Sequence, residues 1–281
     1  MPNGSTRGIC LLRGWPIILR PLTAGWKSLA NSPIEPRFLD SFDGTRLAYH
    51  ELGEGRPVVL IHGYFSNAQT NWIRYGHAEA VAAKGFRVIM PDLRGHGDSA
   101  RPHDDASYPP DVLMRDGFAL IEHLGLTDYD LGGYSLGART TVRMLANGAS
   151  PKRVVLSGMG LRGLTDTEGR GGYFRRILTN LGTFERGTLE WLTEAFLKTT
   201  SGDPEALVRV LDTFVDTPRE TVAAITQPVL VVSGEEDEDN GPAPELAELL
   251  PNGLYRAVPG GHMSAVVKPE LGREIADFLG N

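Results

Sequence analysis

The 281-residue chain has one cysteine, Cys10, which excludes an intramolecular disulfide and a cysteine-based metal site. Scarce cysteine fits a reducing compartment, and we expect a cytoplasmic protein. Basic residues are fewer than acidic ones, 28 against 35, and the net charge is −7. This balance argues against a nucleic-acid partner, which would need a basic face. With 41% hydrophobic residues, the chain can bury the core of one large α/β domain with an insertion, or of two small domains.

The first 36 residues differ from the rest of the chain. They contain no uninterrupted apolar run of the 7–15 residues or so that a secretory signal needs, or of the roughly 20 that a membrane span needs. We therefore expect no transmembrane segment. Three readings stay open: a poorly ordered leader, a wrongly assigned start, or an arm that packs on the domain. We favour a peripheral N-terminal arm over residues 1–36 that carries no catalytic residue.

Strand and helix patterns alternate along most of the remaining chain. Asp43-Gly44 predicts a hairpin between strands at 37–42 and 45–52. Buried strands are predicted at 58–61, 86–90 and 228–233, and further strands at 129–131, 153–156 and 254–258. Helices are predicted at 66–84, 109–124, 138–146, 243–250 and 269–279. This alternation predicts an α/β fold whose mostly parallel sheet is covered by helices on both faces.

One block departs from the alternation. Residues 159–225 contain no buried-strand pattern and predict a loop followed by several helices. Because the block lies between two core strands, we expect it to be an insertion over one end of the sheet. The core is then expected over residues 37–158 and 226–281.

Gly133-Tyr134-Ser135-Leu136-Gly137 fits the G-x-S-x-G nucleophile elbow, in which a strand turns sharply into a helix with a serine at the apex. Glycines are needed beside the serine because side chains there would collide across the turn. A strand pattern precedes the motif and a helical pattern follows it, as the elbow requires. The order predicts Ser135 as a nucleophile at the carboxyl end of a strand, where α/β sheets carry their ligands.

A serine hydroxyl needs a base, and His262 follows the last predicted strand on the glycine-rich loop Pro259–Met263. The other six histidines are weaker candidates. The acid that orients the histidine is expected in the run 235–239, after another strand. We choose Asp237, with Asp239 as the open alternative. For the two backbone donors of an oxyanion hole, we choose the amides of Leu136 and Tyr64.

These motifs, together with Asp92–Ser99 and His62-Gly63-Tyr64, make the chain resemble the α/β-hydrolase superfamily. The resemblance implies an eight-stranded, mostly parallel sheet with an antiparallel strand near its start. It also implies that residues 159–225 form a helical cap and that Asp92 and Arg94 are scaffold residues beside the active site. The order Ser135, Asp237, His262 is that of the superfamily.

The residues narrow the activity within this superfamily. Relatives that use an aspartate nucleophile, such as haloalkane dehalogenases and epoxide hydrolases, do not match Ser135. The C–C bond hydrolases and the prolyl iminopeptidases usually carry other residues around the serine. Carboxylesterases, lactonases and cofactor-free perhydrolases remain compatible. We expect hydrolysis of small or medium carboxylic esters through an acyl-enzyme, with neither metal nor organic cofactor.

Two alternatives stay open, namely a lyase or acyltransferase with the same triad, and a ligand receptor of this fold whose triad turns over slowly. Pocket walls are harder to predict, because an apolar side chain is more often plain core packing. The candidates are Phe65, Tyr134, Met159, Phe174, Trp191, Phe196 and Met263.

Overall fold

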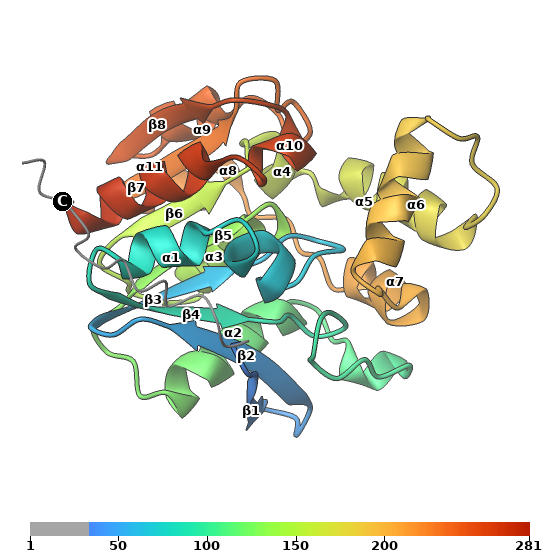
Figure 1. Cartoon of the computed structure of the whole chain (residues 1–281), viewed down its shortest axis with the longest axis horizontal. Helices are drawn as coiled ribbons and strands as arrows, with labels where there is room; N and C mark the ends of the chain where they lie inside the picture. The colour runs from blue at the N-terminus through green and yellow to red at the C-terminus, as the bar shows by residue number, and fades with distance from the viewer. Residues whose placement is uncertain (1–33) are drawn as a thin grey trace, which may run out of the picture. The chain divides into compact units, whose positions relative to one another are not determined.

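The computed structural model of the chain describes residues 34–281. The N-terminal arm predicted over residues 1–36 therefore lies outside the described residues, apart from its last three positions. The described part is built on one twisted sheet with helices packed against it (Figure 1). None of its helices combines the length and the apolar composition that crossing a membrane requires.

The sheet has eight strands in the order β1-β2-β4-β3-β5-β6-β7-β8. They are β1 (Arg37–Asp40), β2 (Arg46–Leu52), β3 (Arg56–Ile61), β4 (Phe86–Pro91), β5 (Asp130–Tyr134), β6 (Val154–Ser157), β7 (Val229–Gly234) and β8 (Gly253–Val258). Strand β2 is antiparallel to both of its neighbours, and all pairs from β4 to β8 are parallel. The predicted α/β fold, mostly parallel with an antiparallel strand near its start, is confirmed.

Helices cover both faces of this sheet, because the side chains of a strand alternate between the faces. On β3, Val58 and Leu60 pack in one apolar cluster with α1 (His77–Ala82) and α11 (Pro269–Gly280). Val59 and Ile61 point the other way and pack in a cluster with α2 (Val112–His123). Helices α3 (Leu136–Ala146) and α9 (Ala243–Leu249) extend this second face over β6 and β7.

The single helix predicted over residues 66–84 is wrong. The chain forms a π-helical turn at Gln69–Ile73 and then the short helix α1. Gly76 lies between them with φ 77°, a left-handed conformation that ends a helix and favours glycine. Trp72 is fully buried as predicted, so the interrupted segment still fills the core. Helix α2 also begins later than predicted, after a 3₁₀ turn at Asp105–Ser107 and a left-handed Asp111.

Five helices lie between β6 and β7: α4 (Arg162–Thr165), α5 (Thr167–Thr179), α6 (Leu189–Thr199), α7 (Pro204–Asp212) and α8 (Arg219–Ala223). Leu164 of α4 and Val222 of α8 pack in the core cluster that contains β6 and β7. Helices α5, α6 and α7, drawn yellow to orange, form a group beside the sheet in Figure 1. We call these three the outer helices, and we propose that they are the cap proper within residues 159–225.

Candidate active site

Ser135 sits at the apex between β5 and α3 with φ 52° and ψ −108°, a sparsely populated conformation for a residue with a side chain. Its amide donates to the carbonyl of Ser157 on the next strand, at 2.8 Å. A Cβ at Gly133 would lie 2.3 Å from the backbone of Gly137, the predicted collision across the turn. A Cβ at Gly137 would instead meet the carbonyl oxygen of Ile61 on β3, at 2.0 Å. The second glycine therefore lets the helix approach the neighbouring strand.

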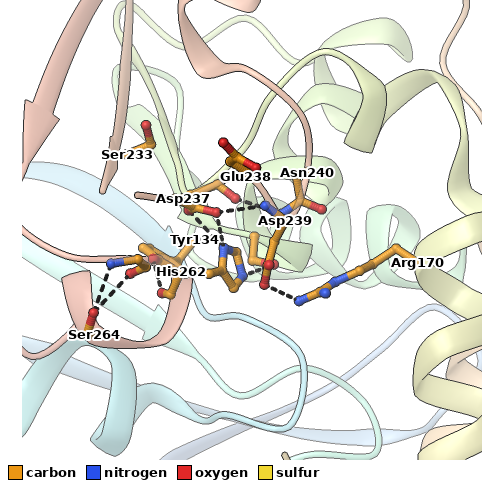
Figure 2. Close-up of polar contacts among 12 residues, drawn as sticks. Tyr134, Arg170, Ser233, Asp237, Glu238, Asp239, Asn240, His262 and Ser264 are labelled. Atoms are coloured by element: carbon orange, nitrogen blue, oxygen red, sulfur yellow. Dashed lines mark hydrogen bonds and ion pairs between the residues drawn. The ribbon is translucent and has the colours of Figure 1, made fainter. Parts of the chain in front are cut away.

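The structure brings the three predicted catalytic side chains into one hydrogen-bonded chain. His262 opens the short helix α10 (His262–Ala265) after β8, and Asp237 follows β7. The imidazole Nε2 is 3.0 Å from the Ser135 hydroxyl oxygen. The imidazole Nδ1 is 2.9 and 3.1 Å from the two carboxylate oxygens of Asp237 (Figure 2). The Asp237 side chain is 1% exposed, so this contact is shielded from water.

Asp239, the alternative acid, faces elsewhere. Its carboxylate forms an ion pair with Arg170 of α5, at 2.5 Å, and its amide donates to Asp237 Oδ1 at 3.2 Å (Figure 2). Asp237 is therefore the carboxylate that contacts the imidazole. Sequence reasoning did not single out Arg170, because an arginine in a polar helical segment has no local signature.

The two amides chosen as oxyanion donors come from the elbow itself and from the loop after β3. Leu136 is the first residue of α3, so its N–H has no acceptor within the helix. Tyr64 follows Gly63, where an added Cβ would lie 3.6 Å from the Ser135 Cβ. Among residues 34–281, the Tyr64 amide donates to no other protein group. The Tyr64 hydroxyl donates to the Leu207 carbonyl of α7 at 2.7 Å, which ties this loop to the outer helices.

Tyr134, predicted as a possible pocket wall, supports the histidine instead. Its hydroxyl donates to the backbone carbonyl of His262 at 2.5 Å, and the two rings are 5.4 Å apart. Burial raises the pKa of this phenol well above its ordinary value, and the carboxylates of Asp237 and Asp239 raise it further. The hydroxyl therefore remains a neutral donor.

The other predicted wall residues differ in their surroundings. Phe174 of α5 packs against Tyr64 and Phe65, with ring centroids 4.8 and 5.2 Å apart, so these aromatic rings join the outer helices to the loop after β3. Met159 is buried in the core cluster of β6 and β7, whereas Met263 is half exposed. Trp191 and Phe196 of α6 are partly buried.

Asp92 and Arg94 hold the loop after β4. Asp92 is buried and accepts hydrogen bonds from the amides of Ala68 and Asp98. Arg94 is fully buried and forms ion pairs with Asp116 at 2.7 Å and with Asp43 at 2.6 Å. Every contact of these two side chains supports backbone or another scaffold residue.

Two groups in the described residues bring metal-ligand side chains together: His50, Asp92 and Asp98, and Asp237, Asp239 and His262. In each group the ligand atoms lie within 4.8 Å of one another. Asp92 already accepts two backbone hydrogen bonds, and the second group is held by Arg170 and by the contact of His262 with Ser135. A cation would have to displace these partners, and we assign no metal to either group.

Comparison with known proteins agrees with this geometry. The model of a family described as "Alpha/beta hydrolase family" matches residues 58–272. The chain belongs to this family. A non-heme chloroperoxidase of Kitasatospora aureofaciens is 28% identical over 272 residues, which is 84% of this chain and 97% of that protein.

Solved structures of other α/β hydrolases share the fold. An esterase from Exiguobacterium antarcticum superposes with a TM-score of 0.72 at 18% identity, over 88% of this chain and 100% of that one. An enol-lactonase from Burkholderia xenovorans superposes with a TM-score of 0.68 at 24% identity, over 87% and 100% of the two chains. At these identities the superpositions establish the fold, and the reaction has to be argued from the site.

Proposed function

We propose that this α/β hydrolase cleaves small or medium carboxylic esters through a covalent acyl-enzyme. The observation that carries the proposal is the continuous chain from Asp237 through His262 to Ser135. A hydroxyl is a weak nucleophile unless a base takes its proton, and Nε2 of His262 is within hydrogen-bonding distance of that proton.

In the first half-reaction, Ser135 Oγ attacks the ester carbonyl carbon and its proton passes to His262 Nε2. The amides of Tyr64 and Leu136 donate to the oxyanion of the tetrahedral intermediate. The bond from carbon to the alcohol oxygen then breaks, and the proton on His262 passes to the departing oxygen. Asp237 keeps Nδ1–H oriented and stabilises the imidazolium. The products of this half-reaction are the free alcohol and the acylated Ser135.

In the second half-reaction, water attacks the acyl carbon while His262 takes one of its protons. The bond to Ser135 Oγ breaks, His262 returns the proton to the serine, and the free acid leaves. Water is the only co-reactant, and neither half-reaction requires a metal or an organic cofactor.

Hydrolysis of p-nitrophenyl esters from acetate to long acyl chains tests the proposal. We expect turnover by the native protein and a fall in kcat of at least about 10⁴-fold in Ser135→Ala. The acyl-chain length of the ester with the highest kcat/KM then indicates the length of the acyl pocket. Unchanged turnover in Ser135→Ala would contradict the proposal.

A second candidate is perhydrolysis, and the similarity to a chloroperoxidase over nearly its whole length favours it. Hydrogen peroxide would then replace water in the second half-reaction, and a peracid would leave instead of an acid. We expect the two activities to share Ser135 and to differ only in the attacking molecule. Measuring peracid against acid at increasing peroxide concentration separates them, because a hydrolase without peroxide selectivity yields peracid only in trace amounts.

A further inference from the structure

Arg170 of α5 lies beside the candidate active site, in contact with Asp239 and close to the ring of Phe174. Its guanidinium contacts Asp239. A carboxylate oxygen of Asp239, one of Asp237 and a ring nitrogen of His262 lie within 4.8 Å of one another. On its other side the guanidinium lies 4.8 Å from the ring of Phe174, which packs on Tyr64. Arg170 therefore places a positive charge on the loop that carries Asp237, and Phe174 of the same helix packs on Tyr64.

Most N–H donors of Arg170 have no hydrogen-bond acceptor within the described residues. A guanidinium offers five N–H donors, and Asp239 is its only hydrogen-bond acceptor among residues 34–281. Within the described residues, the Nε atom is buried without a partner. The side chain as a whole is 23% exposed, so a further acceptor would reach its terminal N–H groups.

A cavity of about 340 Å³ opens beside this guanidinium, a volume within the range of small-molecule sites. Its charged lining residues are Arg162, Arg170, Asp166 and Asp239. Arg162 makes one hydrogen bond, to the Glu238 carbonyl, and no ion pair within the described residues. Two cations thus face the cavity, and only one of them is in contact with a carboxylate.

We propose that Arg170 recognises a carboxylate on the leaving-group half of the substrate, so that the enzyme prefers esters of anionic alcohols or phenols. The inference rests on the proposed ester hydrolysis. His262 delivers a proton to the departing oxygen, so the leaving group lies on the histidine side of the carbonyl, next to Asp239 and Arg170. Asp239 is the resting counter-ion, and the N–H groups of Arg170 that Asp239 does not use donate to the substrate's carboxylate beside it.

The test compares two acetate esters that form the same acetyl-enzyme. In 4-acetoxybenzoate the ring carries a carboxylate, and in 4-isopropylphenyl acetate it carries a neutral group of similar shape; 3-acetoxybenzoate adds a second position for the charge. The readout is the ratio of kcat/KM for the anionic ester to kcat/KM for the neutral one. Different leaving-group reactivity cancels when this ratio is compared between variants.

We expect Arg170→Met to lower the ratio roughly 10- to 100-fold, as loss of a hydrogen bond to a charged group does. Asp239→Asn removes the competing carboxylate and is expected to raise the ratio about 3- to 10-fold. Arg176→Met is the matched control, because Arg176 lies on the same helix but pairs with Glu190 outside the cavity lining. It removes the same charge and should leave the ratio unchanged.

The contrary reading is that the pair of Arg170 and Asp239 merely holds α5 in place. Both variants would then change the two esters in equal proportion, and constant ratios would overturn the proposal while leaving ester hydrolysis intact. Absence of turnover of all three esters by the native protein would overturn the proposed function and this inference with it. If Arg170→Met does not fold, Arg170→Gln serves, because it also removes the positive charge, and an unchanged ratio in that variant would likewise overturn the proposal.

Discussion

At the scale of single residues, the site depends on a serine whose backbone is strained and on a histidine held from two directions. Ser135 keeps φ 52° because β5 and α3 fix both of its neighbours. His262 is held at its ring by Asp237 and at its carbonyl by Tyr134. We expect Asp237 and Tyr134 to orient His262, the proposed base, without contacting the substrate.

Substitution of Asp237 and substitution of Asp239, the two candidate acids after β7, should lower kcat to very different extents. Asp237→Asn leaves the shape unchanged but removes the charge that stabilises the imidazolium, and we expect kcat to fall on the order of 10⁴-fold. Asp239→Asn should cost at least 100-fold less, because its carboxylate contacts Arg170 rather than the ring. Steady-state kinetics on p-nitrophenyl acetate checks this, and similar losses in both variants would contradict the assignment of Asp237.

Tyr134→Phe tests the support beneath the histidine. Loss of the hydroxyl leaves the buried His262 carbonyl without its donor, and we expect a destabilisation of about 1–3 kcal/mol. We also expect kcat to fall about tenfold with KM little changed, because the base is less well oriented. The control is Tyr108→Phe, which removes a buried hydroxyl that has no partner among residues 34–281. Thermal unfolding and kinetics of the two variants measure the difference.

At the scale of the elements, helix α3 approaches the end of strand β3 closely at Gly137, where no side chain separates the two backbones. Gly137→Ala would place a methyl group 2.0 Å from the Ile61 carbonyl oxygen, and a backbone contact this short forces helix and strand apart. We expect loss of more than about 3 kcal/mol of stability and loss of activity.

Gly171→Ala is the matched control for this substitution. Gly171 lies within α5, and apart from its chain neighbours and the local helix backbone, no atom of the described residues would lie within 4 Å of a Cβ added at this position. Alanine at such a helix position is expected to stabilise by about 0.5–1 kcal/mol. Denaturant unfolding measures the free energy of unfolding of both variants. Equal changes in this free energy would contradict the argument that α3 and β3 approach each other closely at Gly137.

The elements that could be predicted are those fixed by local patterns. Continuous apolar runs identified the core strands, and glycine spacing identified the elbow, because both reflect sterics within a few residues. The break at Gly76 was missed because a single glycine within a helical pattern does not by itself predict that the helix ends there. The contacts of Tyr134 and Arg170 join segments far apart in the chain, so no local pattern could reveal them.

At the scale of the whole molecule, buried neutral histidines make stability depend on pH. Burial, together with the neighbouring His62, lowers the pKa of His96 from its ordinary 6.5 to about 3. Below pH 6.5 the unfolded chain binds a proton that the folded chain does not bind, so this contribution is complete above pH 6.5 and is lost as the pH falls toward 3. We expect about 3 kcal/mol less stability from this group at pH 4 than at pH 7.

The variant His96→Gln isolates this effect. It removes the titrating group, and the loss of stability between pH 7 and pH 4 should be correspondingly smaller than in the native protein. Urea unfolding at both pH values measures the difference between the two proteins. If the stability of the two proteins changed equally between pH 7 and pH 4, His96 would have the same pKa in the folded and unfolded states, which would contradict this account.

The central claim is that Ser135 is a nucleophile activated by His262. Covalent labelling of the whole protein with a fluorophosphonate, followed by intact mass measurement and peptide mapping, tests it most directly. We predict one adduct per chain, located on Ser135, with no adduct in Ser135→Ala and a rate at least about 10³-fold lower in His262→Gln. Labelling at another residue, or equally fast labelling of Ser135 in His262→Gln, would contradict it.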